Sequence, residues 1–390
     1  MTQIEAVVLG CGTPKFSMGW THAFQLLQPP LKDLCKLVAI VEPFLLSESN
    51  VAGNSALVKA RADLRKFGEE HGVALVQSAA KLDGMVGRER EQGLNRVGVI
   101  SVRTSDSKKL FEVAVNELHC NAVYLEKPGA TSVAEMDEII ALAKEKGIIV
   151  MTGYSRNLGN AISRALEYAG RRESEGQTPT ITLVHSNPWS QVELAECFKR
   201  CRPGMLFDMA CHDLAIGIAY FGLNAADVER DGAVLVDSES VQATLGGITD
   251  FVRLKFSIEI ENAGKKRRLH FLVDRCSGAF NGVFVSNGEA DESEKKFLSG
   301  ENPMYPNPLE DLSPHLACQY DYYVEAKRVL LQSLKQGAQL PPGAPTLAVA
   351  RETLVLAEKL TARLQAVVPF AKESETSPSP KKAKTSPSPA

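Results

Sequence analysis

The sequence predicts an α/β protein whose first part is a doubly wound parallel sheet and whose second part is an α+β unit with a large, open, mainly antiparallel sheet. Over the first 150 residues, short runs of Val, Ile and Leu alternate with longer amphipathic stretches. Such runs are typical of parallel strands that are buried on both faces and joined by helices. From residue 251 to residue 260, apolar and polar residues alternate instead, which indicates an antiparallel strand with one buried face. A chain of 390 residues also has room for two domains.

Six short apolar runs account for the strands of the first sheet. They are Ile4–Leu9, Leu37–Val41, Val73–Val76, Val97–Val102, Ala122–Leu125 and Ile148–Thr152. The stretches between them carry apolar residues at helical spacing, as Val133, Met136 and Ile139 do within the predicted helix Ser132–Lys146. This order of strand, helix and strand predicts parallel strands with helices packed on the sheet.

The second part combines strands and helices differently. Predicted strands are Ile181–His185, Ala233–Asp237, Phe251–Ile260, Arg268–Asp274 and Gly282–Ser286, and predicted helices are Gly204–Gly222, Asp321–Leu334 and Thr346–Leu364. Residues 262–264 have the composition of a hairpin turn. We therefore expect a domain at residues 1–152, a second at 153–370 and a tail at 371–390, with the last helices free to pack back on the first domain.

The tail is rich in Ser, Pro and Lys and has few apolar residues, so we expect it to be disordered. Its basic cluster, Lys381 to Lys384, is flanked by Ser-Pro pairs and has two interpretations, a nuclear-import address or a solvated tail. The chain shows neither a signal peptide at its start nor an apolar run long enough to cross a membrane. We therefore expect a cytoplasmic protein without a membrane partner.

Charge and cysteine content exclude further classes of protein. The chain carries 44 basic and 47 acidic residues, a formal net charge of −3, so no nucleic-acid partner is expected. Eight cysteines are too few and too irregularly spaced for a disulfide framework, which favours free thiols. Cys197, Cys201 and the pair Cys211-His212 have metal-binding residue types, but their spacing differs from that of zinc sites. We therefore expect no metal.

A glycine-rich loop follows the first predicted strand, at Gly10 and Gly12. Glycine at such a turn lets backbone N–H groups approach a pyrophosphate at the start of the next helix, as in Rossmann dinucleotide-binding domains. The fingerprint places a third glycine at position 15, but the next glycine of this chain is Gly19, so the loop is longer than usual. Glu42 ends the second strand, where a carboxylate accepts hydrogen bonds from ribose hydroxyls, and Thr104 follows the fourth strand.

These residues predict NAD as the cofactor. A 2′-phosphate beside Glu42 would be repelled, and no Arg or Lys follows directly to bind it. NADP stays an alternative because Lys15, in the lengthened loop, could reach a phosphate.

Two further segments carry groups suited to acid–base chemistry. Glu126, Lys127 and Pro128 follow the fifth strand, at the carboxyl edge where doubly wound sheets bind ligands. Asp208 and His212 lie four residues apart within the predicted helix 204–222, so we expect them on one face. A His with a carboxylate one turn away is suited to accept and return a proton. The alternative is that these two side chains only satisfy each other within the helix packing.

Taken together, these segments resemble the glucose–fructose oxidoreductase/inositol dehydrogenase (Gfo/Idh/MocA) family over roughly residues 4 to 365. The matching motifs are Gly19-Trp-Thr-His22-Ala23, Glu126-Lys127-Pro128, the spacing Gly204, Asp208, His212, and Gly153-Tyr154-Ser155-Arg156. Two features depart from the family pattern. The phosphate loop is longer, and the acid often found three residues after the histidine is Ala215 here.

The resemblance implies an enzyme that moves a hydride between NAD(P) and a hydroxyl-bearing carbon of a sugar, cyclitol or similar polyol. It implies His212 as general base, Lys127 on the substrate oxygen and Asp208 in an orienting role. It also implies cofactor contacts from the glycine loop, Glu42, Thr104, Glu126 and Lys127, and a homodimer or homotetramer. Pocket walls are expected from residues near the end of the sixth strand or of a strand of the second part, namely Tyr154, Arg156, His185 and Trp189. A non-catalytic dinucleotide-binding regulator on the same fold is the alternative function.

Overall fold

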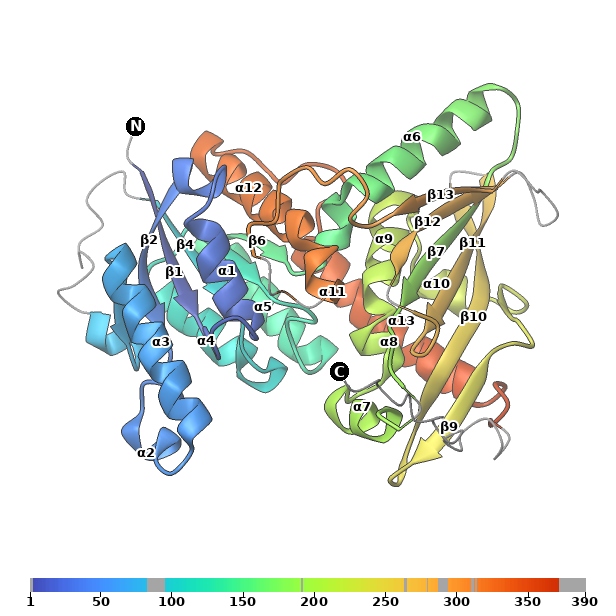
Figure 1. Ribbon diagram of the computed structural model, residues 1–390. Coiled ribbons are helices and arrows are strands. Elements are labelled where there is room, and N and C mark those ends of the chain that lie inside the picture. Colours follow the sequence, from blue (N-terminus) through green and yellow to red (C-terminus); the bar gives the residue numbers. More distant parts are fainter. Residues whose placement is uncertain are drawn as a thin grey trace, which may run out of the picture.

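The computed structural model describes residues 3–82, 95–190, 192–262, 265–278, 280–286, 294–309, 312 and 314–371. Two sheets lie side by side, with helices between and around them (Figure 1). Residues 372–390 of the predicted tail, including Lys381 and Lys384, and residues 263–264 of the predicted turn lie outside the described residues. None of the described helices is long and apolar enough to cross a membrane.

The first sheet is fully parallel and has the order β3-β2-β1-β4-β5-β6. Its strands are β1 (Ile4–Leu9), β2 (Cys35–Val41), β3 (Ala74–Val76), β4 (Arg96–Ile100), β5 (Ala122–Leu125) and β6 (Ile149–Thr152). The predicted doubly wound sheet is confirmed, because the strand order reverses direction between β1 and β4. Ligands of such sheets bind at the carboxyl ends of the strands next to this reversal.

Helices cover both faces of the first sheet. These are α1 (Met18–Leu26), α2 (Glu48–Val51), α3 (Ser55–His71), α4 (Thr104–Asn116) and α5 (Val133–Lys146). Val8 of β1 packs in a core with Leu26 of α1 and Leu64 of α3, whereas Val7 packs in a core with Phe111 of α4. Alternate residues of one strand thus enter two different cores, which explains the continuous apolar runs in the sequence.

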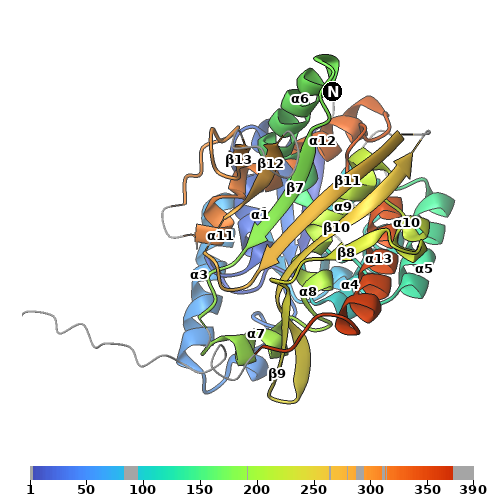
Figure 2. The ribbon, with the colours of Figure 1, turned by 90° about the vertical axis from the view of Figure 1, so that its right-hand side faces the viewer.

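Within the described residues, the second sheet has seven strands and is mainly antiparallel, as predicted; of its described strand pairs, only β7 with β11 is parallel. Its path is β13-β12-β7-β11-β10-β8, with β9 beside β10. The strands are β7 (Thr180–Ser186), β8 (Val234–Val236), β9 (Val241–Leu245), β10 (Ile248–Asn262), β11 (Lys265–Asp274), β12 (Asn281–Ser286) and β13 (Lys295–Leu298). Figure 2 shows this sheet face on, with α9 and α13 behind it.

The inner face of the second sheet packs on helices from three regions of the chain. Leu214 of α9, Ile162 of α6 and Leu360 of α13 share one core with Leu183 and Leu254 of the sheet. The remaining helices are α6 (Asn160–Ser174), α7 (Leu194–Arg200), α8 (Met205–Asp208), α9 (Cys211–Phe221), α10 (Ala225–Glu229), α11 (Pro314–Ala317), α12 (Tyr320–Gln336) and α13 (Leu347–Gln365). The opposite face carries a hollow of about 640 Å³ lined by residues such as Thr182, Lys255 and Phe284.

The single helix predicted at residues 204–222 is wrong, because the chain forms α8 and α9 with a break at Met209 and Ala210. In a continuous helix the His212 N–H would donate to the Asp208 carbonyl oxygen. Here it donates to Met209 instead, at 3.3 Å, and the Asp208 carbonyl accepts from Lys127. A contact from another part of the chain therefore competes with the helical hydrogen bond and ends α8.

The last two helices tie the two halves of the chain together. Val324 and Leu331 of α12 lie in the same core as Leu26 of α1, and Gln25 donates to the carbonyl of Tyr320 at 3.0 Å. Helix α13 contacts both α5 and α9, so it lies between the two sheets (Figure 1).

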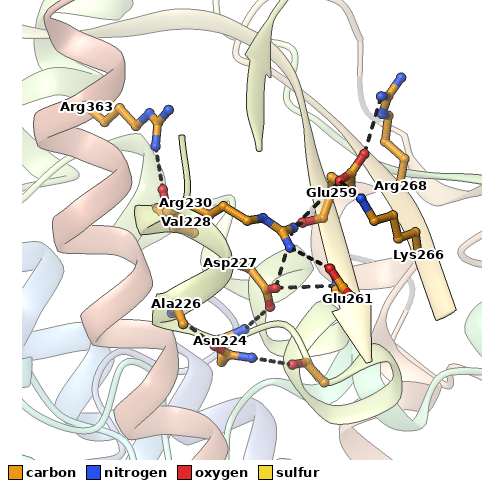
Figure 3. Close-up of polar contacts among 11 residues, drawn as sticks. Asn224, Ala226, Asp227, Val228, Arg230, Glu259, Glu261, Lys266, Arg268 and Arg363 are labelled. Atoms are coloured by element: carbon orange, nitrogen blue, oxygen red, sulfur yellow. Dashed lines mark hydrogen bonds and ion pairs between the residues drawn. The ribbon is translucent and has the colours of Figure 1, made fainter. Parts of the chain in front are cut away.

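Polar contacts fix α10 and α13 at the edge of the second sheet (Figure 3). Arg230, directly after α10, donates to the Glu259 carbonyl and to the Glu261 carboxylate of β10. Arg363 of α13 donates to the Val228 carbonyl at 2.5 Å. These contacts link α10 to strand β10 on one side and to α13 on the other.

Candidate functional site

The glycine loop, Glu42, Thr104 and Glu126 lie at one edge of the first sheet, the carboxyl ends of its parallel strands. Gly10 and Gly12 have φ angles of +84° and +67°, which disfavour residues with a side chain. A Cβ on Gly19 would lie 1.9 Å from the Gly10 carbonyl oxygen, so only glycine lets α1 approach the loop this closely. Gly19 therefore makes the close helix–strand approach of the fingerprint's third glycine, despite the longer loop.

Glu42 is only 4% exposed and its carboxylate clasps the glycine loop. One oxygen accepts from the Cys11 and Gly12 amides at 2.9 and 2.7 Å, and the other accepts from the Phe44 and Leu45 amides at 3.0 and 3.2 Å. A carboxylate can accept about four hydrogen bonds, so these four amides fill its capacity. The structure thus places Glu42 at the predicted position, and a ribose hydroxyl would have to exchange with one of these amides.

The residues at this edge fit a dinucleotide. Helix α1 begins directly after the loop, and Ser17 at its N-cap makes no side-chain capping bond. The N–H groups of a first helical turn have no partners within the helix and attract anions such as phosphates. The positive-φ glycines, the close Gly19 packing and this uncapped helix start together form a cradle of the kind that holds a pyrophosphate.

Lys127 and Asp208, distant in sequence, meet at the same edge. The Lys127 ammonium donates to the Asp208 carbonyl at 2.8 Å and to its carboxylate at 3.1 Å. Burial opposes the charge on the amine, but Asp208 raises the pKa of Lys127 above its ordinary value. Lys127 in turn holds the pKa of Asp208 well below its usual range. The pair is therefore charged on both sides over the physiological pH range.

His212 lies on the first turn of α9, directly after Cys211, whose Sγ is 3.4 Å from the Asp208 carbonyl oxygen. Its ring packs edge-on against the Tyr154 ring, and the ring centroids are 5.8 Å apart. The centroid of the His185 ring also lies 5.8 Å from that of His212. Tyr154 follows Gly153, where a Cβ would lie 2.8 Å from the Lys127 backbone nitrogen. Two adjacent residues after β6 thus touch the Lys127 turn on one side and His212 on the other. The three predicted acid–base residues are brought to one region by this turn.

A buried ion pair that sequence reasoning did not foresee lies next to His212. Asp213 is fully buried, with its carboxylate 2.7 Å from Arg156 and 3.8 Å from the His185 Nδ1. Burial raises the pKa of Asp213 to about 6, against the opposing effect of Arg156. Arg156 also donates to the Val184 carbonyl at 3.0 Å. The only sequence signal was an acid directly after the histidine, in place of the acid expected at position 215.

The remaining predicted residues lie elsewhere. Trp189 packs with Leu194 and Phe198 in a separate apolar cluster near α7. The Cys197 and Cys201 sulfur atoms lie 3.8 Å apart. Among the residues that the structure describes, no group of three or more His, Cys, Asp or Glu side chains has a metal-binding arrangement.

The fold, a Rossmann-like parallel sheet followed by an open, mainly antiparallel sheet, is shared with solved structures of dehydrogenases. The fold implied by the resemblance to the glucose–fructose oxidoreductase/inositol dehydrogenase family is confirmed by solved structures. Myo-inositol 2-dehydrogenase from Lactobacillus plantarum matches with a TM-score of 0.64 at 16% identity, over 94% of this chain and 98% of that one. Scyllo-inositol dehydrogenase from Lactobacillus casei, with bound NAD(H) and scyllo-inositol, matches with a TM-score of 0.64 at 13% identity, over the same shares.

Sequence comparison gives a shorter match. The chain is 25% identical over 149 residues to the myo-inositol 2-dehydrogenase of Thermotoga maritima, which spans 38% of this chain and 42% of that protein. No family model matches the sequence.

Proposed function

We propose that this protein is an NAD(P)-dependent oxidoreductase that moves a hydride between a nicotinamide cofactor and a hydroxyl-bearing carbon of a sugar, cyclitol or similar polyol. The observation that carries the proposal is the Lys127–Asp208 ion pair at the carboxyl edge of the Rossmann sheet, with His212 beside it. The inositol dehydrogenases that share the fold, one of them solved with NAD(H) and scyllo-inositol, support the substrate class.

The two parts of the chain would divide the work, with residues 1–152 binding the dinucleotide and residues 153–370 binding substrate. Gly10, Gly12 and Gly19 would let backbone amides approach the phosphates, and Thr104 and Glu126 would border the cofactor at neighbouring strand ends. A bound nicotinamide would supply the hydride acceptor or donor.

The chemistry of the chain's own residues is proton transfer and charge stabilisation. The His212 imidazole would take the hydroxyl proton of the substrate as the C–H bond is oxidised. The Lys127 ammonium would donate a hydrogen bond to the same oxygen, on which negative charge develops. Asp208 keeps that ammonium protonated and holds it in place, since it accepts two hydrogen bonds from the Nζ. Tyr154, Arg156 and His185 would wall the pocket around His212, with Trp189 farther out.

We further propose NAD as the preferred dinucleotide. The Glu42 carboxylate lies at the end of β2, where it would repel a 2′-phosphate. The hydrogen bonds that this carboxylate accepts from the Cys11 and Gly12 amides also hold its negative charge next to the glycine loop. Tighter binding of NADPH than of NADH in a fluorescence titration would contradict this preference and point to Lys15.

Hydride transfer across a panel of cyclitols and sugars tests the function directly. We expect the purified full chain to reduce NAD⁺ with at least one polyol, measured by absorbance, and a Lys127→Met variant to lose this activity. Native mass spectrometry of the same sample shows whether a dinucleotide binds. Absence of both dinucleotide binding and turnover would sink the proposal.

A further inference from the structure

A buried lysine from the far end of the chain lies beneath the Glu126–Lys127 turn. Lys327 of α12 is 1% exposed, and its Nζ lies 2.9 Å from Nδ1 of His22 in α1. The other ring nitrogen of His22, Nε2, lies 2.9 Å from a carboxylate oxygen of Glu126. His22 itself is fully buried. Three elements, α12, α1 and the end of β5, therefore meet in one continuous line of polar atoms.

The hydrogen positions along this line follow from what each group can donate. An ammonium only donates, so the Nδ1 of His22 accepts from Lys327. The imidazole is then neutral with its proton on Nε2, and that N–H donates to the Glu126 carboxylate. Lys327 thus selects the one tautomer of His22 that can hold Glu126.

Lys327 has little else to compensate its charge. Among the residues that the structure describes, no carboxylate oxygen lies within ion-pair distance of its Nζ. The rings of Tyr124 and Tyr323 face it, at 5.1 and 5.9 Å from the Nζ, and the Cys35 thiol lies in the same surroundings. Burial lowers the pKa of Lys327 to about 7, against the attraction of Glu126. Burial, and then Lys327, lower the pKa of His22 to about 4.

A buried lysine so placed costs stability that a methionine of similar length would not. The hydrogen bonds that begin at Lys327 end at the Glu126 carboxylate, which is held by further contacts. The second oxygen of Glu126 accepts from the Lys127 backbone N–H at 3.2 Å, and the Tyr124 hydroxyl donates to the first at 3.3 Å. Both carboxylate oxygens of Glu126 thus accept hydrogen bonds, and the next residue in the chain is Lys127, which pairs with Asp208.

We propose that Lys327 and His22 are positioning residues, a hydrogen-bond chain that fixes the Glu126 carboxylate and, through it, the place of the Lys127 ammonium. The inference rests on the proposed function for its catalytic consequence, but the chain itself is a property of the protein alone. Neither residue touches the Lys127–Asp208 pair; they act through Glu126.

Nitrogen NMR of the full-length protein, with ¹⁵N-labelled histidine, tests the Lys327–His22–Glu126 hydrogen bonds without substrate or cofactor. We expect one of the seven histidines to stay neutral with its proton on Nε2 from pH 5 to pH 9, and a His22→Gln variant to remove that signal. Lys327→Met removes the ammonium but leaves Glu126, so the pKa of His22 should rise by about one unit or more. Lys327→Arg keeps a charged donor and should keep the tautomer.

The proposed hydrogen-bond chain would be overturned if His22 titrated like an exposed histidine in the wild type, or if the pKa of His22 were the same in Lys327→Met as in the wild type. Circular dichroism of each variant confirms folding, and Lys327→Gln offers a second neutral variant should the methionine not fold. Neither outcome depends on whether the protein turns over a polyol.

The positioning role is then read from kinetics on the substrate found in the polyol panel. Misplacement of Lys127 should lower kcat about tenfold or more in Lys327→Met, with KM changed far less, because the charge that Lys127 stabilises develops in the transition state. Lys327→Arg should restore much of the rate. If the pKa of His22 rises in Lys327→Met but kcat is unchanged, the positioning role is wrong. If the wild type turns over no polyol, the proposed function is wrong instead.

Discussion

At the scale of single residues, the site depends on how neighbouring charges set protonation. Lys127 and Asp208 stabilise each other's charged forms, while His212 sits against the aromatic ring of Tyr154. Asp213, which the sequence marked only as a neighbour of His212, is an internal carboxylate with its own ion pair to Arg156. Substitutions at His212 and Asp208, and at the buried Lys327, test these protonation states by rate, pH dependence and stability.

His212→Asn should leave dinucleotide binding intact and lower kcat for polyol oxidation. Proton transfer by a placed side chain contributes about 10² to 10⁴-fold, and asparagine cannot accept the proton. Steady-state kinetics and an NADH titration on the same sample give the two quantities. A well-folded variant at full rate would remove His212 from the mechanism.

Asp208→Asn should move the alkaline limit of activity to lower pH. Burial opposes the charge on Lys127 and Asp208 sustains it, so removal of the carboxylate lowers the pKa of the amine and its protonated form is lost at lower pH. The pH profile of kcat for variant and wild type shows the shift, and the acid limb serves as an internal control. An unshifted alkaline limb would contradict the coupling.

Lys327→Met should be more stable than the wild type at neutral pH, by up to about 4 kcal/mol. The pKa of Lys327 is lowered on folding from 10.5 to about 7, so the unfolded chain binds the proton more tightly. The cost is therefore complete below about pH 7 and disappears as pH rises toward the unfolded value. Urea unfolding of both proteins at several pH values should show the stability difference shrinking over that window; a constant difference would contradict it.

At the scale of secondary-structure elements, close approaches decide the geometry. The break between α8 and α9 occurs where Lys127 takes the Asp208 carbonyl from the helix, and α1 begins where Gly19 touches the backbone of the glycine loop. The first contact joins α8 to the turn after β5, and the second joins α1 to the loop that directly precedes it.

Gly19→Ala should weaken dinucleotide binding at least tenfold, because the new Cβ would lie 1.9 Å from the Gly10 carbonyl and would push α1 off the loop. Gly170→Ala in α6 is the matched control, since no atom lies within 4 Å of its added Cβ. It should bind normally and gain up to about 1 kcal/mol of stability. Equal affinities for the two variants, measured by NADH fluorescence, would be evidence against the cradle.

At the scale of the whole molecule, the second sheet covers its inner face with helices and leaves a hollow on its outer face, with Thr182 and Phe284 in its lining. An open sheet of this size is a surface on which subunits pair. We expect a homodimer or homotetramer assembled through this face.

Light scattering at micromolar concentration should give a multiple of the 42.3 kDa chain mass. Thr182→Arg, in the lining of the hollow, should lower that mass by placing a charge in the interface. A control arginine at Val58, an exposed position on α3 of the other domain, should leave it unchanged. A wild type of monomeric mass would contradict this assembly.

The parallel sheet, its flanking helices and the mainly antiparallel second sheet were all predictable, because hydrophobic period and turn glycines are properties of adjacent residues. The same local information made Lys127, Asp208 and His212 candidates for the site, and the fold brings them to one region. It wrongly joined α8 to α9, since the competing donor, Lys127, lies 81 residues away from Asp208.

Local pattern thus determined the fold class and the candidate site residues, whereas only the folded chain decided how those groups are held. Glu42 accepts from amides 30 and 31 residues away, Arg156 pairs with Asp213, which lies 57 residues later in the chain, and Lys327 contacts His22 over a separation of 305 residues. No window of sequence contains both partners of such contacts. They form because packing of distant elements against each other buries polar groups away from water, and a buried polar group must find its partner within the protein.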